Sequence, residues 1–225
     1  MEIEPNTDGW TDGWLEDTRA SYDTVAASYA DQLRNLLDET PHEREFLALF
    51  AEQVRTRGGG QVADVGCGPG RITAHLRDLG VDAFGIDLSP GMIEVARRDH
   101  PGLRFELGSM TDLDLADDSM AGLVAWYSLI HVPDDEIGSV FAHFKRVVRP
   151  GGPLLLGFHV GDESQLKTQG YGGHPMKLYV HRRQHSHMAA WLNEAGFTVE
   201  AHKTLTSAES TLGGIVLARR QPDTQ

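Results

Sequence analysis

The sequence predicts an α/β protein: a doubly wound, mostly parallel seven-stranded sheet with an N-terminal helical cap and an antiparallel C-terminal hairpin. Between residues 61 and 160, short apolar runs alternate with segments of helical spacing, which is the pattern of parallel strands joined by crossover helices. A glycine-rich turn, "GCGPG" at residues 66–70, follows the first of these runs. The last two apolar runs, residues 197–204 and 213–220, are joined by a short polar connection without a helix, which indicates antiparallel pairing.

Two helical segments are expected before the first strand. From Leu15 to Glu39, apolar residues recur every three or four positions, which indicates an amphipathic helix. Pro41 suits the first turn of a second helix, and the glycines of residues 58–60 end it. We therefore expect residues 1–40 to form an N-terminal segment and helical cap over a core of residues 41–225.

The core elements follow in order along the chain. Ser89-Pro90 is a capping pair that opens a helix, and Gly80 and Gly196 end two others. Residues 160–180 contain a glycine cluster and no sustained period, so we expect a lid-like surface loop there. The predicted strands are 61–66, 82–88, 103–108, 120–130, 151–160, 197–204 and 213–220, and the predicted helices are 70–80, 91–99, 133–148 and 181–195.

Composition and charge exclude several classes of function. The 225 residues include 33 acidic and 20 basic side chains, for a net charge of −13, so nucleic acid and anionic membrane are poor partners. No apolar run reaches the length of about 18 residues that a membrane span requires. Because the first residues also lack the pattern of a secretory leader, we expect a cytoplasmic protein. Cys67 is the only cysteine, which excludes an internal disulfide and a multi-cysteine metal site.

The turn at residues 66–70 does not match the common phosphate-binding motifs. The dinucleotide fingerprint G-x-G-x-x-G/A has Arg71 at its last position here, and the lysine of the G-x-x-x-x-G-K-S/T loop is absent. Asp87 lies about 20 residues beyond the first glycine, where an acidic side chain accepts hydrogen bonds from ribose hydroxyls. Asp64 should carry a second negative charge into the pocket, which favours a ligand with a cationic group over a pyrophosphate.

Two stretches, "DVGCGPG" at residues 64–70 and "GIDLSPGMIEVAR" at residues 85–97, resemble motifs of the class I S-adenosylmethionine-dependent methyltransferases of the small-molecule type. The resemblance extends from Tyr22 to Arg219 and implies a Rossmann-like core. It also implies transfer of a methyl group from S-adenosylmethionine to an oxygen or nitrogen atom of a small natural-product or metabolite intermediate, with S-adenosylhomocysteine as the product. We expect a monomer or a homodimer.

The resemblance implies a set of cofactor-binding residues. The backbone at Gly66 and Gly68 would lie against the cofactor, Asp64 would bind near its methionyl ammonium, and Asp87 would hold its ribose. The family often has an acid after the third strand, and its absence here leaves adenine recognition to backbone groups. The other implied contacts are Leu88 and Met92 along the adenine, Ser109 and Met110 at its border, Tyr127 and Ser128 at the methionyl part, and Tyr22 and Tyr29 closing over the cofactor.

Two histidines are candidates for catalysis, because ligands of a doubly wound sheet bind beyond the carboxyl ends of its strands. His131 follows the fourth predicted strand and is the first choice for a general base or an acceptor-orienting group; the alternative is a histidine that braces the next helix. His159 ends the fifth strand, where the expected lid begins. His181, His185 and His187 have a spacing that could hold a metal, but no paired carboxylates accompany them. We therefore expect a solvated helix face and no metal site.

Two other functions stay open. The chain could bind S-adenosylmethionine without transferring its methyl group, as a cyclase of the same fold would. A nicotinamide oxidoreductase is disfavoured by Arg71. The aromatic residues of the cap and the expected lid suggest an apolar or planar acceptor, although packing of the cap against the core would also account for them: Trp10, Trp14, Tyr22, Tyr29 and Tyr171.

Overall fold

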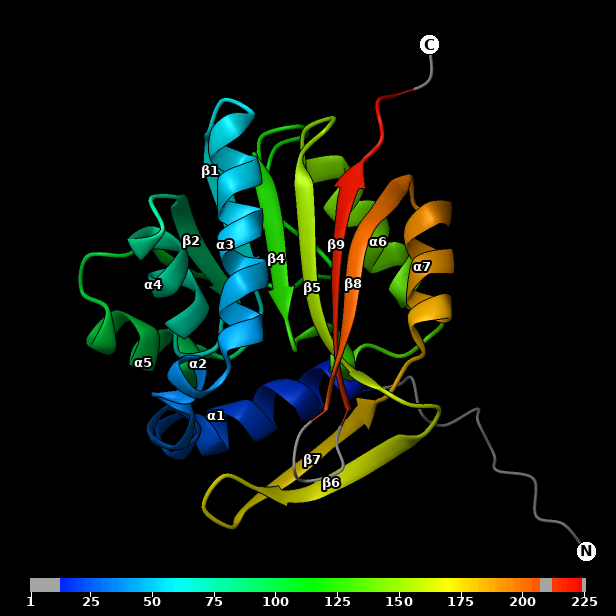
Figure 1. The fold of residues 1–225 in the computed structure, drawn as a ribbon. Helices are drawn as coiled ribbons and strands as arrows, with labels where there is room; N and C mark the ends of the chain where they lie inside the picture. The colour runs from blue at the N-terminus through cyan, green and yellow to red at the C-terminus, as the bar shows by residue number, and fades with distance from the viewer. Residues whose placement is uncertain (1–12, 207–211, 224–225) are drawn as a thin grey trace, which may run out of the picture.

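The protein is built on one seven-stranded sheet with the strand order β3-β2-β1-β4-β5-β9-β8 (Figure 1). The computed structural model describes residues 13–206 and 212–223; Trp10 and the rest of residues 1–12 lie outside this range. The predicted fold class is confirmed. The strands of the sheet are β1 (Gln61–Val65), β2 (Asp82–Asp87), β3 (Phe105–Leu107), β4 (Gly122–Trp126), β5 (Pro153–Val160), β8 (Phe197–Thr206) and β9 (Leu212–Arg220).

Strand direction follows the connections. The first five strands pair in parallel because each crossover contains a helix or a long connection, whereas β9 pairs antiparallel with both β5 and β8. The order reverses between β1 and β4, since β2 and β3 extend to one side of β1 and β5 lies on the other side of β4. Such a reversal leaves a crevice beyond the carboxyl ends of the strands.

Helices cover both faces of the sheet because the strand side chains alternate between two apolar clusters. Val62 and Val124 pack with α3 (Pro41–Thr56) and α4 (Arg71–Asp78). Ala63 and Leu123 point to the other cluster, which contains α6 (Ile137–Val147) and α7 (His185–Glu194). At the β2 and β3 side lies α5 (Pro90–Asp99), whose first turn is capped by the Ser89 hydroxyl as the sequence predicts.

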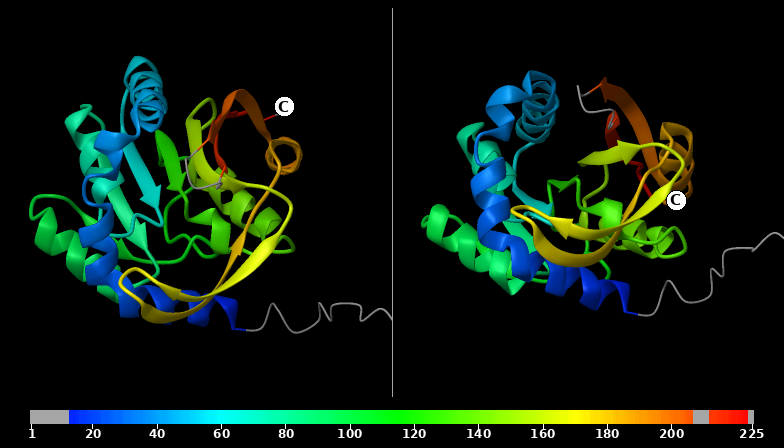
Figure 2. Two further views of the ribbon diagram at one scale, coloured as in Figure 1. Left: turned by 60° about the horizontal axis from the view of Figure 1, so that its bottom comes forward. Right: turned by 90° about the horizontal axis from the view of Figure 1, so that it is seen from below.

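The N-terminal helix α1 (Trp14–Leu33), followed by the short α2 (Leu36–Glu39), runs across the carboxyl edge of the sheet (Figures 1 and 2). Val25, Ala26 and Ala30 form its buried face. Asp23 joins it to α5, because its Oδ1 accepts hydrogen bonds from the Ser89 hydroxyl at 2.6 Å and the Gly91 N–H at 2.9 Å. None of the helices in the described ranges is long and apolar enough to cross a membrane.

The segment expected to be an irregular loop is instead a hairpin of two strands, β6 (Ser164–Gly170) and β7 (His174–His181). The prediction of a loop at 160–180 is therefore wrong. All side chains of residues 164–169 are exposed, so the sequence has no alternation of apolar and polar residues to indicate a strand. The hairpin lies beside α1 across the same edge of the sheet (Figure 2).

The connection after β4 also differs from its prediction. The strand ends at Trp126 because Tyr127 has a left-handed φ of 54°, a conformation that ends an extended strand. A short 3-10 helix follows at Leu129–His131. Arg183, which is 2% exposed, holds this connection: it donates to the carbonyl oxygens of Leu129 and Val132 and pairs with Asp134.

We predict that Arg183→Met lowers the free energy of unfolding by about 3 kcal/mol, because two buried carbonyl groups lose their donor at about 1–3 kcal/mol each. Denaturant unfolding measures this value. The control is Arg98→Met, since Arg98 is exposed and pairs only at the surface; it should change stability by less than about 0.5 kcal/mol. Equal stability of the two variants would contradict the anchoring role of Arg183.

Candidate active site

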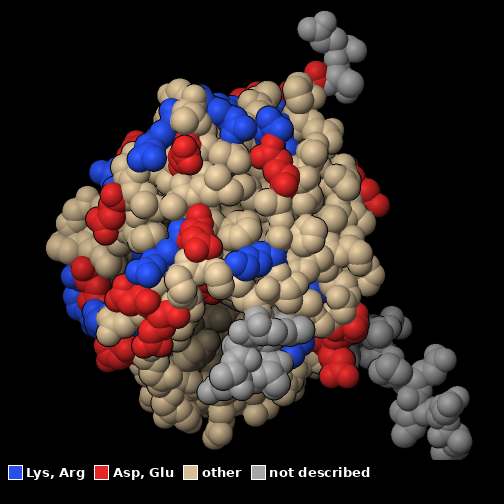
Figure 3. Space-filling view, viewed as in Figure 1, with Lys and Arg blue, Asp and Glu red and all other residues tan. Residues whose placement is uncertain are grey.

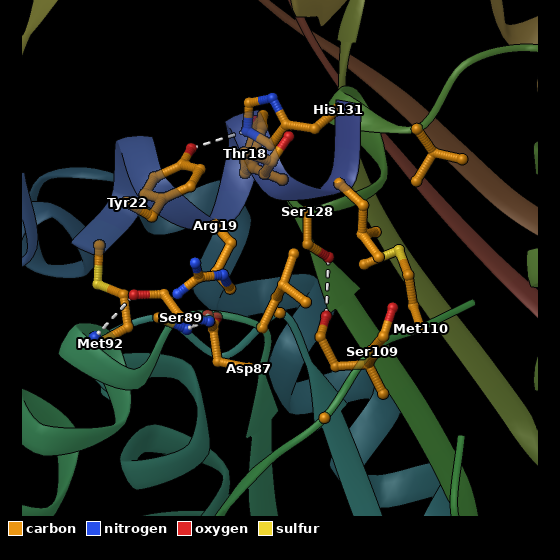
Figure 4. A pocket seen from close by; sticks show the side chains of 18 of the residues that line it. Thr18, Arg19, Tyr22, Asp87, Ser89, Met92, Ser109, Met110, Ser128 and His131 are labelled. Carbon is orange, nitrogen blue, oxygen red and sulfur yellow. Dashed lines mark hydrogen bonds between the residues drawn. The ribbon is translucent and has the colours of Figure 1, made fainter. Parts of the chain in front are cut away.

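A cavity lies at the switch point between β1 and β4, covered by α1 (Figure 4). It collects residues from the ends of β1, β2 and β4 and from the segment after β3. Twelve of the fourteen residues that the sequence predicts for the site line it: Tyr22, Tyr29, Gly66, Gly68, Asp87, Leu88, Met92, Ser109, Met110, Tyr127, Ser128 and His131.

The glycine turn brings backbone to the cavity surface. A Cβ atom on Gly66 would lie 2.2 Å from Cβ of Ser128, and the φ of Gly66 is +76°. At Gly68 a Cβ atom would contact the Tyr29 ring at 3.8 Å, so the ring lies over the turn. Glycine at position 66 therefore lets Ser128 approach the turn, and the backbone of both glycines lies at the cavity surface.

Asp87 ends β2 and points into the cavity (Figure 4). Its two carboxylate oxygens accept the N–H groups of Gly68 at 2.7 Å and Ser89 at 2.9 Å. Burial raises the pKa of Asp87 to about 6, and these backbone donors oppose that rise. Each carboxylate oxygen has a second lone pair, so Asp87 can accept hydroxyl groups as well as hold the turn.

Asp64 does not line the cavity, which differs from the prediction. Its side chain lies on the same face of β1 as that of Val62 and points beneath α4. There the Thr73 hydroxyl donates a hydrogen bond to Oδ2 of Asp64 at 2.6 Å. Burial raises its pKa to about 7, and Oδ1 has no hydrogen-bond partner in the described part of the chain. The residue next to it, Val65, is the one that faces the cavity.

The side of the cavity beside Asp87 is mostly apolar. Leu88, Met92 and Met110 line it, while the Ser109 hydroxyl is engaged with Thr111 at 2.7 Å in its own turn. Four cavity residues from α1 were not among the predicted site residues, because helical periodicity does not distinguish a helix that packs on a core from one that covers a ligand site: Trp14, Leu15, Thr18 and Arg19.

His131 contacts Tyr22 across the cavity (Figure 4). Nδ1 of His131 lies 2.8 Å from the Tyr179 carbonyl oxygen, which can only accept, so Nδ1 carries the proton. Nε2 is then an acceptor, and it receives the Tyr22 hydroxyl at 2.7 Å. Burial lowers the pKa of His131 to about 4, so the ring is neutral at pH 7.

His159 does not line the cavity. Its ring lies against Tyr127, with centroids 5.2 Å apart, and burial lowers its pKa to about 4. The structure thus brings only one of the two predicted catalytic histidines to the cavity.

The three histidines of residues 181–187 have separate surroundings. His181 is hydrogen-bonded to Ser164 of β6 and His185 to Thr204 of β8. Within residues 13–206 and 212–223, no group of three or more His, Cys, Asp or Glu side chains is arranged to hold a metal ion.

Comparison with known proteins agrees with this geometry. Residues 62–152 match the family model described as a methyltransferase domain. The demethylmenaquinone methyltransferase of Renibacterium salmoninarum is 30% identical over 141 residues, which are 63% of this chain and 58% of that protein. The chain spans about half the length of the first curated relatives it matches.

Solved structures share the fold. The 1,6-didemethyltoxoflavin-N1-methyltransferase of Burkholderia thailandensis, solved with 1,6-didemethyltoxoflavin and S-adenosylhomocysteine, has a TM-score of 0.68 and 22% identity over 93% of this chain and 89% of that one. The [4+2]-cyclase SpnF has a TM-score of 0.66 and 17% identity over 92% of this chain and 97% of that one. The domain match over residues 62–152, the sheet order and the glycine turn that ends β1 together support assignment to the class I S-adenosylmethionine-dependent methyltransferases.

Proposed function

We propose that this protein transfers a methyl group from S-adenosylmethionine to an oxygen or nitrogen atom of a small-molecule acceptor, a natural-product or metabolite intermediate. The observation that carries the proposal is that one cavity holds both Asp87 beside the glycine turn and the hydrogen-bonded Tyr22–His131 pair. Asp87 and the glycine turn suit a nucleoside cofactor, and the Tyr22–His131 pair can take up a proton from an acceptor.

The residues of the cavity fit the cofactor. Asp87 has lone pairs for the ribose hydroxyls, and the bare backbone at Gly66 and Gly68 leaves room for the methionyl chain. Leu88 and Met110 provide apolar surfaces for the adenine. The other cavity residues assigned to cofactor binding are Tyr22, Tyr29, Met92, Ser109, Tyr127 and Ser128. Asp64, which lies beneath α4 outside the cavity, is not assigned a direct contact with the cofactor. When bound, the cofactor supplies an electrophilic methyl group on a sulfonium.

Tyr22 and His131 would remove the proton that the acceptor loses. The Tyr22 hydroxyl already donates to Nε2 of His131, so Tyr22 can pass its proton to Nε2 as its own oxygen takes one from the acceptor. Burial raises the pKa of Tyr22 well above 10, which keeps the phenol protonated until a base accepts from it. His131 is then the general base acting through Tyr22, and His159, which lies outside the cavity, is left with the weaker role of supporting Tyr127.

The cap and the hairpin would enclose the reacting groups. Tyr29 of α1 lies against Tyr171 at the hairpin turn, with ring centroids 4.5 Å apart, and β7 supplies the carbonyl group that holds His131. The described part of the N-terminal segment, residues 13–40, and the hairpin would thus cover the core that begins at Pro41, and they would exclude water from the transfer.

The acceptor is a small molecule rather than a nucleic acid. Acidic side chains outnumber basic ones, and on the face in Figure 3 the two kinds are interspersed without a continuous basic patch. Phosphate backbones bind where Lys and Arg are clustered. We propose no membrane partner and a monomer or homodimer.

The second candidate is a cyclase that binds the cofactor without using its methyl group. It is favoured by one observation, the similarity of the fold to the cyclase SpnF. The two functions are separated by incubating the protein with methyl-labelled S-adenosylmethionine and small acceptors that bear a phenol, a carboxyl group or an amine. Label in the acceptor and an equal amount of S-adenosylhomocysteine would support the methyltransferase; an acceptor converted without gain of a methyl group would support the cyclase.

We predict that Asp87→Ala weakens S-adenosylhomocysteine binding about 100-fold, because hydrogen bonds to a charged group contribute about 1.5–3 kcal/mol and about 1.4 kcal/mol is a factor of ten. Titration calorimetry measures the affinity, and a thermal melt checks that the variant folds. Asp82→Ala is the control, since Asp82 is exposed at the opposite end of the same strand. Unchanged affinity in Asp87→Ala would refute the ribose contact.

We predict that Tyr22→Phe and His131→Gln each lower the turnover rate about 100-fold or more at pH 7, the usual range for loss of a general base. At saturating S-adenosylmethionine the wild-type rate should be constant above about pH 5, because a base with a pKa near 4 is already neutral there, and it should fall as more acidic solution protonates His131. The measurement is the initial rate from pH 4 to 9, with the methylated product identified by mass. A His131→Gln enzyme with the wild-type rate across this range would show that His131 is not the base.

A further inference from the structure

The tip of the β6–β7 hairpin carries a tyrosine that packs on α1. Tyr171 lies between the end of β6 at Gly170 and the start of β7 at His174, and its φ is +39°. A bulky residue is rarely found in this left-handed region, and it persists there where surrounding contacts hold it. Residues 172–175 are exposed, whereas Tyr171 is half-buried. The contacts of the Tyr171 side chain therefore help to fix the conformation of the tip.

The main partner of Tyr171 is Tyr29 of α1. The two ring centroids lie 4.5 Å apart, with the ring planes at 62°, and such an edge contact between two aromatic rings is attractive. Both rings pack against the apolar cluster that contains Val25. The backbone of the tip is close to α1 as well, since a Cβ atom on Gly172 would lie 3.5 Å from Cβ of Ser28. The tip is thus seated directly on the second half of α1.

Tyr29 connects this contact to the cavity. Tyr29 lines the cavity and Tyr171 does not. The Tyr29 ring lies over the glycine turn, 3.8 Å from a Cβ atom placed on Gly68, and its centroid is 5.8 Å from that of the Tyr22 ring. Because Tyr29 contacts both the hairpin tip and the glycine turn, a change at Tyr171 would act on a bound ligand through Tyr29.

The rest of the hairpin is attached to α1 by contacts that do not involve Tyr171. The Lys177 N–H donates to the hydroxyl oxygen of Ser21 at 2.8 Å, and the Lys177 ammonium group pairs with Asp17 at 2.8 Å. These contacts hold β7 against the first half of α1. Removal of the Tyr171 ring should therefore leave the hairpin in place and change only the contact at its tip.

We infer that Tyr171 is a positioning residue that holds Tyr29 over the glycine turn and so sets how fast S-adenosylhomocysteine leaves the cavity. This inference rests on the proposed function, because it takes the cavity as the cofactor site. While the Tyr171 ring is in place, Tyr29 can move off the turn only by separating from it. When the ring is removed, this restraint is lost and the product leaves sooner. Release of product limits turnover in many enzymes whose site is covered by a mobile element.

The test measures how fast S-adenosylhomocysteine binds to and leaves the immobilised full-length protein by surface plasmon resonance. Tyr171→Asn removes the ring, and asparagine tolerates a left-handed φ, so the turn at the tip keeps its shape. Its dissociation rate should rise about 3- to 10-fold, the range for loss of one aromatic contact. The association rate should stay within about twofold of the wild type, which also shows that the variant is folded.

Two control variants accompany this measurement. Tyr171→Phe keeps the ring and removes only the hydroxyl group, so its dissociation rate should match the wild type within about twofold. Leu166→Ala removes an exposed side chain from β6 of the same hairpin and should release the ligand at the wild-type rate.

A double-mutant cycle shows whether the effect passes through Tyr29. Tyr29→Leu alone should also speed release of S-adenosylhomocysteine. Adding Tyr171→Asn to Tyr29→Leu should then change the dissociation rate by less than about 1.5-fold, because the ring that Tyr171 restrains is absent. A role of Tyr171 that is only structural would instead act independently of Tyr29, and the two effects would multiply.

The outcomes separate this inference from the function on which it rests. If the wild type binds S-adenosylhomocysteine and Tyr171→Asn releases it equally slowly, the inference is wrong while the cofactor assignment stands. The same conclusion follows if Tyr171→Phe releases the ligand as fast as Tyr171→Asn, or if the effects at Tyr171 and Tyr29 multiply. If the wild type does not bind S-adenosylhomocysteine, the proposed function fails and the role of Tyr171 fails with it. Faster release that depends on both rings supports the inference.

Discussion

The close approach of β1 to the segment after β4 is the constraint on which the site depends. The chain can turn at Gly66 only because no side chain is present there, since a Cβ atom would overlap with Ser128. Ser128 in turn donates its hydroxyl to the Val65 carbonyl oxygen at 2.8 Å, so the ends of the two central strands are joined. This contact brings the glycine turn, Asp87 and the Tyr127–His131 connection around one cavity.

Polar contacts, and not apolar packing alone, attach α1 and the β6–β7 hairpin to the connection after β4. His131 joins the connection after β4 to α1 through Tyr22 and to β7 through Tyr179. Arg183 ties the end of the hairpin to the same connection. The residue that would accept the proton therefore also sets the position of the two elements that exclude water. A base held in this way needs no rearrangement of its own before it accepts a proton from Tyr22.

Most of the sheet and half of the site could be predicted from the sequence, because both depend on local patterns. Alternating apolar runs and helices determine a parallel sheet, and the distance from Gly66 to Asp87 reflects one turn, one helix and one strand. The hairpin at 164–181 was missed because β6 is exposed and polar along most of its length, although β7 has alternating apolar residues at Met176, Leu178 and Val180 that pack toward α1. Because side chains alternate between the two faces of a strand, the sequence could have shown that Asp64 shares the face of Val62, which is the face toward α4 and not toward the cavity.

The bond between Asp23 and the first turn of α5 has a consequence for how the cavity opens. Asp23 accepts from Ser89 and Gly91, and Ser89 is also the residue whose N–H binds Asp87. When α1 lifts, these two donors lose their acceptor at the place where Asp87 is held. Ser89 therefore links α1 to the carboxylate that is proposed to hold the ribose, and a displacement of α1 would act on Asp87 through this one residue.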